Sequence, residues 1–319
     1  MQLIRNSYVG IPYKQRYIYM NTPLALGSTD AEIYAEINVV GGGISSLKLN
    51  GQEYMGGWPA STGGTTSGFV MSPVICSVTK DGKFTHAGQD YTPGKHGITR
   101  NLAFDIVAKD NNRVTLRHVF DPAAQPGVYP FRHQIEIEYT VTSDTLTARV
   151  TMTNLDTQDM RFAMGMHPAF MWPLPGVESP HSLWLDQPMP DATVTYCPVD
   201  GIFQTGKTFE NPLAAGQWQP AKADFAGDAY FIRHGEAPVT LHWGDRANPA
   251  GHSLIFDMQG WDGFGVWSKT DESPFICIEP FAGIPITDGQ ATPALEDVHG
   301  LRVLKPGQSA TATMTIRLG

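Results

Sequence analysis

Residues 134–152 read QIEIEYTVTSDTLTARVTM, and this stretch decides the fold class. Apolar and polar side chains alternate from Gln134 to Thr142 and again from Thr145 to Met152, with Ser143-Asp144 between the two runs. A period of two places successive side chains on opposite faces of a strand, so one face is buried and the other is wet. The stretch therefore predicts an antiparallel β-hairpin with a tight turn.

The same signal recurs along the rest of the chain. Apolar residues alternate with polar ones over 312–318, after a turn at Pro306-Gly307. Further short strands are predicted at Ile37–Val40, Ile44–Leu49, Val114–Phe120 and Phe275–Ile278. We find no long apolar stripe of helical period and no alternation of strands with helices, which disfavours a doubly wound α/β fold. We expect an all-β fold, a large antiparallel β-sandwich.

Length and composition bear on the number of domains. The chain has 319 residues, with 33 Gly, 24 Pro and only 17% charged residues. A prior of roughly 150 residues per domain would suggest two domains, but all-β domains often exceed it. The Pro/Gly-rich stretches Trp58–Gly68 and Pro173–Pro180 are interpreted as long surface loops, not as linkers. We expect one domain over residues 1–319.

Charge and hydropathy narrow the class of partner. The net charge is −9 and no basic block occurs, which argues against a nucleic-acid partner. No apolar run approaches the ~18 residues of a membrane helix, and Met1–Met20 lacks the apolar stretch of a signal peptide. Cys76, Cys197 and Cys277 are odd in number and far apart, so we expect free thiols. These features predict a cytoplasmic protein that binds neither nucleic acid nor membrane.

Glu279 is the most unusual charged residue. It follows the continuously apolar run Pro274–Ile278 and precedes Pro280-Phe281, so we expect a carboxylate at the end of a buried strand. Such a group is costly unless it is paired or used, and burial raises its pKa towards that of a useful base. His96 and His167 also stand beside apolar segments, where each is either a core histidine or a catalytic one.

Two other classes of site find no support. No two histidines stand at ligand spacing beside a carboxylate or a cysteine, so we predict no metal site. Gly41-Gly42-Gly43 follows one predicted strand and precedes another, whereas a phosphate-binding loop leads into a helix. We interpret these glycines as a tight turn.

Several segments follow one another in a characteristic order along most of the chain. They are 38–47, 80–83, His96-Gly97-Ile98-Thr99-Arg100, Tyr129-Pro130-Phe131, Asn154, Gly165–Phe170, Gly265–Ser268 and Cys277–Gly283. In this order they resemble the aldose 1-epimerase (galactose mutarotase-like) family. The resemblance implies a mutarotase-like β-sandwich with isomerase activity and no cofactor.

The resemblance also implies roles for individual residues. His167 matches the histidine that protonates the ring oxygen of a sugar, and Glu279 matches the base that deprotonates the anomeric hydroxyl. We expect the two to face each other across an open cleft, about a sugar's width apart. The residues expected to bind the substrate are His96, Asp228, Arg100, Trp267 and Phe281, with Trp172 as a further aromatic candidate.

Two alternatives stay open beside this hypothesis. Many family members carry an arginine between the glycine turn and the His-Gly motif, but Ser72–Lys80 has none, so Lys80 or Lys83 could replace it. One alternative is a 1-epimerase of hexose 6-phosphates or other anionic sugars, with Arg100, Arg132 and Arg161 as candidate cations. The other is a non-catalytic carbohydrate-binding protein of the same fold. In every case the partner is a sugar, and the protein is a monomer or a homodimer.

Overall fold

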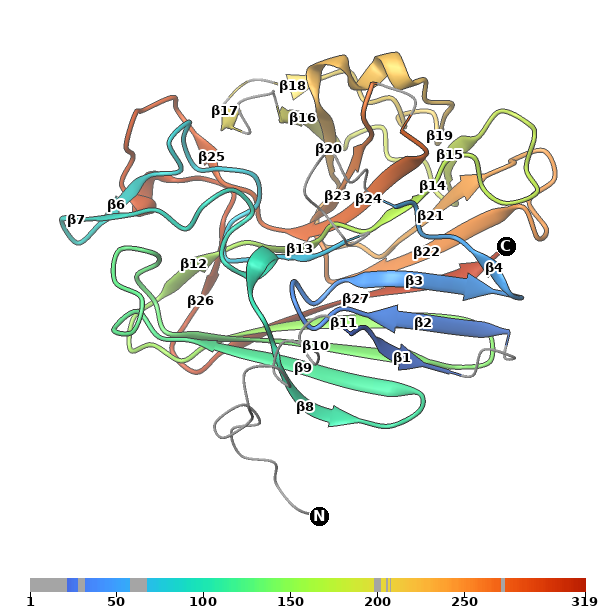
Figure 1. Ribbon diagram of the computed structural model, residues 1–319. Coiled ribbons are helices and arrows are strands. Elements are labelled where there is room, and N and C mark those ends of the chain that lie inside the picture. Colours follow the sequence, from blue (N-terminus) through green and yellow to red (C-terminus); the bar gives the residue numbers. More distant parts are fainter. Residues whose placement is uncertain are drawn as a thin grey trace.

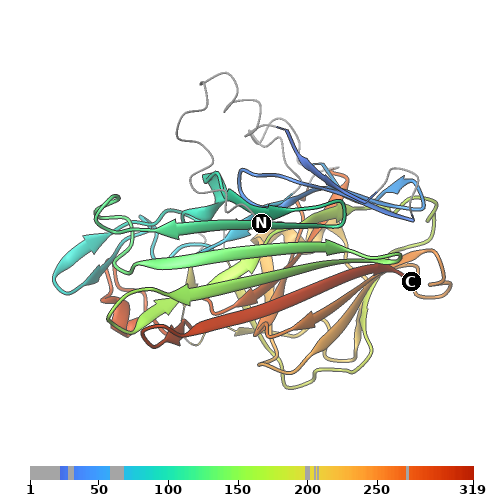
Figure 2. The same cartoon turned by 90° about the horizontal axis from the view of Figure 1, so that it is seen from below.

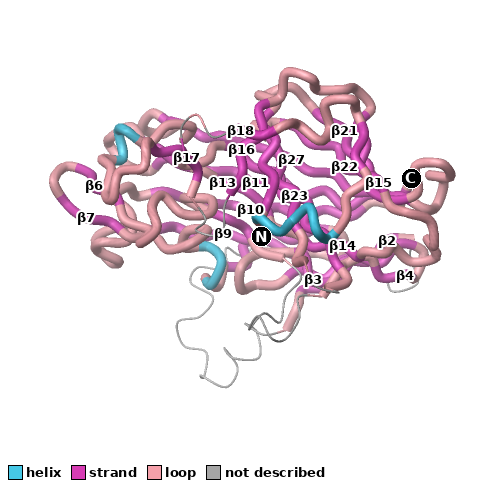
Figure 3. Tube along the Cα trace, turned by 90° about the horizontal axis from the view of Figure 1, so that it is seen from above, coloured by secondary structure: helices cyan, strands magenta, loops and turns pink. Residues whose placement is uncertain are grey.

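The computed structural model describes residues 22–27, 32–57, 68–197, 202–204, 206, 208–270 and 273–319. Met1–Met20, most of the Trp58–Gly68 loop and the side chain of Cys197 lie outside the described residues. Strands joined by loops make up nearly all of the trace (Figure 3), and helical structure in these ranges is limited to short 3-10 turns. These turns are η2 (Thr99–Asn101), η3 (Lys222–Gly227) and η4 (Leu295–Asp297). No helix in the described ranges is both long and apolar enough to cross a membrane.

The larger sheet is antiparallel throughout, and its long strands lie side by side (Figure 2). In spatial order it contains β19 (Gln217–Trp218), β15 (Ser182–Leu185), β21 (Val239–Gly244), β22 (Ser253–Gln259), β27 (Ser309–Leu318), β11 (Thr145–Asn154), β10 (His133–Val141), β9 (Arg113–Phe120) and β8 (Asp105–Lys109). The predicted hairpin is confirmed as β10 and β11, paired from His133 opposite Asn154 to Val141 opposite Leu146. The predicted C-terminal strand is confirmed as β27.

A second antiparallel sheet lies over the first (Figure 1). Its order is β18 (Thr208–Phe209), β16 (Thr193–Cys197), β20 (Ala229–Arg233), β23 (Gly263–Trp267), β24 (Phe275–Ala282), β13 (Met164–Met166) and β5 (Val70–Met71), and β14 (Ala169–Met171) also pairs with β24. A third sheet contains β1 (Leu24–Leu26), β2 (Ile33–Ile37), β3 (Ile44–Leu49) and β4 (Gln52–Glu53). The small two-stranded sheets are β6 (Phe84–His86) with β7 (Gln89–Tyr91), β12 (Met160–Phe162) with β26 (Arg302–Leu304), and β17 (Phe203–Gln204) with β25 (Ile286–Thr287), of which only the last is parallel.

The hydrophobic core lies between these layers. The rings of Phe170 on β14 and Phe256 on β22 meet edge to face, with centroids 4.8 Å apart. The indole N–H of Trp243 on β21 donates to the carbonyl of Met171 on β14 at 3.2 Å, which satisfies a polar group at the buried contact. The predicted antiparallel β-sandwich is therefore confirmed, and β24 runs through the middle of its second layer.

The glycine turn is confirmed as a turn between β2 and β3. Gly41 and Gly42 have φ angles of 78° and 65°, a left-handed conformation that glycine adopts without strain. A Cβ at Gly42 would lie 2.6 Å from Cδ1 of Ile137, so the turn packs directly on the larger sheet. The hydroxyl of Tyr139 donates to the carbonyl of Gly42 at 2.7 Å and ties the turn to that sheet.

Two predicted strand limits were wrong. The strand predicted over Ile37–Val40 ends at Ile37, because the N–H of Asn38 donates to the carbonyl of Gly43 at 2.9 Å and starts the turn. The strand predicted to end at Ile278 continues to Ala282. Glu279 therefore lies inside a fully buried strand and not at its end.

The Tyr139 hydrogen bond gives a stability prediction. Tyr139→Phe removes the hydroxyl and leaves the buried Gly42 carbonyl unpaired, so the free energy of unfolding should fall by about 1–3 kcal/mol. Denaturant unfolding of the wild-type and variant proteins measures the difference. Tyr91→Phe is the matched control, because that hydroxyl bonds at the surface to Gln89 and its loss should cost less than about 0.5 kcal/mol. Equal losses for both variants would contradict the anchoring role of Tyr139.

Candidate active site

Strand register brings the candidate residues together. On one side of β24, Gly165 pairs with Phe281 and Ala169 pairs with Cys277. The same register places His167, in the break between β13 and β14, directly opposite Glu279. Residues opposite each other in an antiparallel pair point to the same face, so the imidazole and the carboxyl are neighbours.

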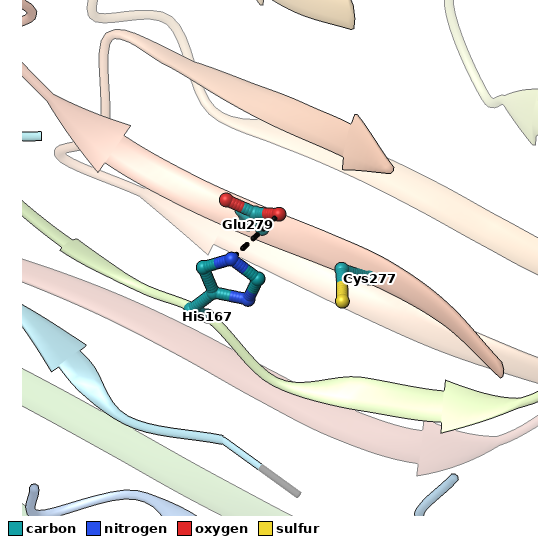
Figure 4. A group of neighbouring side chains, drawn as sticks. All are labelled: His167, Cys277 and Glu279. Atoms are coloured by element: carbon teal, nitrogen blue, oxygen red, sulfur yellow. Dashed lines mark ion pairs between the residues drawn. The ribbon is translucent and has the colours of Figure 1, made fainter. Parts of the chain in front are cut away.

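The structure places Nε2 of His167 3.3 Å from Oε1 of Glu279 (Figure 4). Both residues are almost fully buried, with 5% and 2% of their surface exposed. On the other side of β24, Glu279 pairs with Gly265 of β23. A Cβ at Gly265 would lie 3.3 Å from the Cβ of Glu279, so the missing side chain leaves room beside the carboxyl.

The expected separation of a sugar's width between His167 and Glu279 was wrong. The ring oxygen and the anomeric hydroxyl oxygen of a pyranose are bonded to the same carbon, so they lie closer together than two hydrogen-bonded oxygens. An acid and a base that are adjacent to each other can therefore serve both atoms. The two side chains stand side by side at one wall of a cavity and not on opposite walls of a cleft.

That cavity has a volume of about 190 Å³. Pockets for drug-sized ligands span roughly 300–1,000 Å³, so this one suits a smaller molecule of monosaccharide size. Its walls contain Phe69, Cys76, Lys95, His96, Arg100, His167, Asp228, Ala229, Phe231, Trp267 and Glu279. Six of the seven residues predicted for the site are therefore brought together.

Phe281 is the exception. It is fully buried and packs on Phe231 with ring centroids 5.4 Å apart, so Phe231 and not Phe281 lines the cavity. Phe281 shares the strand face of Glu279, but the glycines opposite it, Gly165 and Gly263, let the neighbouring elements close over its ring. Trp172 also lies outside the cavity wall and packs on Trp243 at 5.3 Å.

Backbone contacts fix the tautomer of His96. The N–H of Cys76 donates to Nδ1 of His96 at 3.2 Å, and the N–H of His96 donates to the carbonyl of Cys76 at 2.8 Å. Burial and the neighbouring cations lower the pKa of His96 well below its usual range, so the ring is neutral. Since Nδ1 accepts a hydrogen bond, the single ring proton is on Nε2. His96 is therefore a hydrogen-bond donor at the cavity wall.

Burial also determines the protonation of the pair. Burial and, to a lesser extent, the nearby Asp228 carboxylate raise the pKa of Glu279 to about 8, while Lys95 opposes the shift. Burial lowers the pKa of His167, and the positive charges of Arg100 and Lys95 add to that effect. Near neutral pH these shifts favour a protonated Glu279 carboxyl beside a neutral His167 ring. The pKa of Asp228 is raised as well, chiefly by burial.

Five residues of the wall were not predicted from the sequence, and Phe69 and Lys95 are the two with the clearest contribution to the site. Phe69 packs against His167 at 4.8 Å and His96 at 5.6 Å, and the guanidinium of Arg100 lies 4.8 Å above its ring. The Phe69 ring thus contacts both histidines and the arginine and helps to hold them in place. Lys95 was also missed, although it directly precedes His96.

The cations at the cavity are not those proposed as replacements for the missing arginine. Lys80 and Lys83 are exposed and do not line the cavity, whereas Lys95 and Arg100 do. Arg132 and Arg161, the other candidates for anion binding, also lie outside the wall. In the described part of the chain, neither Lys95 nor Arg100 has a carboxylate within ion-pair distance.

Comparison with known proteins identifies the family of this chain. The family profile described as aldose 1-epimerase matches residues 26–317. The chain belongs to the aldose 1-epimerase family. Chromosomal LacX of Lactococcus lactis is 25% identical to it over 264 residues, which cover 78% of this chain and 84% of LacX. The plasmid-borne LacX of the same organism is 27% identical over 199 residues, 60% of this chain and 63% of that protein.

Solved structures show the same fold. A galactose mutarotase-like protein from Lactobacillus casei superposes with a TM-score of 0.79 at 21% identity, covering 93% of this chain and 100% of that chain. A galactose mutarotase related enzyme from Lactobacillus acidophilus gives 0.78 at 21% identity, covering 93% and 97%. The galactose mutarotase-like fold of this epimerase family member is therefore established.

A larger groove of about 730 Å³ lies elsewhere, between the segments 186–192 and 233–240. Its wall includes Pro188, Pro190 and Pro238, and it contains none of the residues predicted for the site. Size alone would select this groove, but the buried acid–base pair lies in the smaller cavity. We therefore take the smaller cavity as the candidate active site.

The turn that carries His96 gives a testable prediction. Gly97 has a φ of 74°, and a Cβ there would lie 2.0 Å from the carbonyl oxygen of Ser72. Gly97→Ala should therefore destabilise the protein by at least about 1 kcal/mol more than Gly94→Ala. Gly94 is the matched control, because it lies in the same turn with a φ of 85° and open space around it. Denaturant unfolding measures both, and equal losses would contradict the close packing of this turn on Ser72.

Proposed function

We propose that this chain is an aldose 1-epimerase that interconverts the α and β anomers of an aldose through acid–base opening of the ring. The observation that carries this proposal is the 3.3 Å contact between His167 Nε2 and Glu279 Oε1 at the wall of a monosaccharide-sized cavity. Ring opening needs one proton delivered to the ring oxygen and another removed from the anomeric hydroxyl. An adjacent imidazole and carboxyl meet that requirement, and each such group typically contributes 10²–10⁴-fold.

The pair works as one proton carrier. The proton held by Glu279 first passes to His167 across their 3.3 Å contact. The imidazolium then protonates the ring oxygen while the Glu279 carboxylate takes the anomeric proton. The bond from C1 to the ring oxygen breaks and an open-chain aldehyde forms. Rotation about C1–C2 turns the other carbonyl face towards the C5 hydroxyl. That hydroxyl then adds to C1 and gives its proton to His167, as the Glu279 carboxyl protonates the carbonyl oxygen. The pair returns to its starting state without a cofactor.

The other wall residues hold the sugar. His96 offers its Nε2–H as a donor to a sugar oxygen, and Asp228 offers carboxylate oxygens as acceptors for hydroxyl groups. Trp267, whose ring centroid is 6.1 Å from that of His167, offers a flat face for the apolar C–H side of a pyranose. These contacts orient the anomeric carbon towards the pair.

Removing the base gives the sharpest mutational prediction. Glu279→Gln keeps the shape of the side chain but cannot take up the anomeric proton, so anomer exchange should fall by at least about 10². NMR exchange spectroscopy on an equilibrated aldose measures the rate, and denaturant unfolding checks that the variant is folded. Glu178→Gln, at an exposed position, is the control and should keep the wild-type rate.

The result also separates an enzyme from a binding protein. If the wild-type protein binds an aldose but does not accelerate anomer exchange, the chain is a carbohydrate-binding member of the family. If Glu279→Gln keeps the full rate, the proposed mechanism is wrong.

The raised pKa of Glu279 predicts the pH profile. Below a pH of about 8 the pair retains its one proton, whereas above it both side chains are deprotonated and none is left for the ring oxygen. The value of kcat/KM, corrected for spontaneous mutarotation and measured with EDTA present, should therefore decline above about pH 8. Because burial lowers the pKa of His167, activity should persist into mildly acidic solution. A kcat/KM that shows no decline up to pH 10 would contradict a raised pKa at Glu279.

A second candidate is an epimerase of anionic sugars, such as hexose 6-phosphates. The observation that favours it is the presence of Lys95 and Arg100 in the wall, where no carboxylate of the described residues lies at ion-pair distance from either. Two such cations in a partly enclosed site attract a negatively charged group, and guanidinium groups bind phosphate with paired hydrogen bonds.

If the substrate is anionic, Arg100→Gln should raise KM for the phosphorylated sugar at least about 10-fold and leave the free sugar little changed. Added salt should likewise weaken the binding of the phosphorylated sugar but not that of the free sugar, because salt screens exposed charge pairs. Arg132→Gln is the matched control, since Arg132 is exposed and outside the cavity. Equal turnover of free and phosphorylated forms, insensitive to salt, would exclude this candidate.

A further inference from the structure

The face of β24 that carries Glu279 also carries a thiol that the proposed reaction does not use. Cys277 is two residues before Glu279 on the same strand, so both side chains point to the same face. Cys277 pairs with Ala169 on one side and with Trp267 on the other, and it is fully buried. Because the side chain of Ala169 is small, the sulfur can lie close to the acid–base pair (Figure 4).

The three side chains converge on one point. One ligand atom each from His167, Cys277 and Glu279, namely an imidazole nitrogen, a thiol sulfur and a carboxylate oxygen, lie within 4.8 Å of one another. In a tetrahedral zinc site with bonds of about 2.1 Å, nitrogen and oxygen ligands lie about 3.4 Å apart. The Nε2–Oε1 distance of 3.3 Å already matches that spacing. A shift of the thiol towards the pair completes a three-ligand set, and the cavity supplies the open fourth position.

From this arrangement we propose that His167, Cys277 and Glu279 form a binding site for a thiophilic divalent cation such as Zn²⁺. The charges favour this: a bound metal deprotonates a coordinating thiol, so thiolate and carboxylate together neutralise the ion in a buried setting. Lys95 and Arg100 line the same cavity and repel any cation. A cation that binds through electrostatic attraction alone, without bonds to a thiolate or an imidazole, is therefore disfavoured. Thiolate and imidazole ligands select Zn²⁺ over Mg²⁺ and Ca²⁺.

Occupation of this site switches the enzyme off, a consequence that rests on the proposed function. The metal takes the lone pair of the His167 nitrogen and the Glu279 carboxylate, which are the groups that move protons. Zn²⁺ and sugar therefore compete, and the protein is a mutarotase only while it is metal-free. Local spacing in the sequence could not predict this site, because His167 and Cys277 are distant in the chain and meet only through strand pairing.

Co²⁺ is a suitable probe of the site, because a cobalt–thiolate bond absorbs in the near ultraviolet. The metal-free full-length protein should develop this band on titration with Co²⁺ and lose it on addition of Zn²⁺. Cys277→Ser should lose the band and bind Zn²⁺ at least about 100-fold more weakly, because even partners outside the ligand shell contribute 10–100-fold to affinity. Cys277→Ala is the second variant if the serine variant fails to fold.

Cys76→Ser is the matched control, since Cys76 lines the same cavity but does not belong to the three-ligand cluster. It should keep the cobalt band and the wild-type affinity for Zn²⁺. No cobalt band in the wild-type protein, or an unchanged band in Cys277→Ser, would overturn the site. Zn²⁺ that binds without slowing anomer exchange would overturn its inhibitory role. Absent exchange in the metal-free protein would count against the proposed function alone, because the cobalt band tests the site independently.

Discussion

The register of β24 with its neighbours is the constraint on which the site depends. It places Glu279 in the middle of a buried strand, with Gly265 on one side and His167 on the other. A carboxyl in that position loses most of its hydration, which disfavours its charged form and raises its pKa. A slip of one residue would turn the carboxyl to the other face of the sheet. The contact between His167 and Glu279 thus follows from strand pairing in the second sheet.

Neighbouring segments hold the side chains of this buried site in defined orientations. The N–H of His167 donates to the carbonyl of Phe69 at 2.8 Å, which holds the imidazole in the break between two short strands. Phe69 in turn packs against His96, whose proton is fixed by the N–H of Cys76. Polar groups at the site are therefore oriented before any ligand arrives. Such preorganisation is what an acid–base site needs, because little then has to move during the reaction.

Strands and site residues differed in how far the sequence could predict them. Period-two alternation identified β10, β11 and β27. A strand with one buried and one solvent-exposed face shows alternating apolar and polar residues in its sequence. The roles of His167 and Glu279 came from motif context, since nothing local separates a core histidine from a catalytic one. Phe69 and Lys95 were missed, and the separation of the pair was wrong, because pairing between distant segments sets those positions. The prediction that Phe281 binds substrate failed for a related reason. The alternation of side chains along β24 places Phe281 on the same face as Glu279, but it does not predict which neighbouring residues bury its ring.

The most direct test of the account is a double-mutant cycle on the pair, read out as anomer exchange by NMR. His167→Asn and Glu279→Gln are measured singly and together on an aldose that the wild-type protein turns over. If the two side chains carry one proton between them, either single variant loses nearly all of the acceleration and the double variant loses little more. Losses that multiply would show that the two groups act independently and would contradict the account.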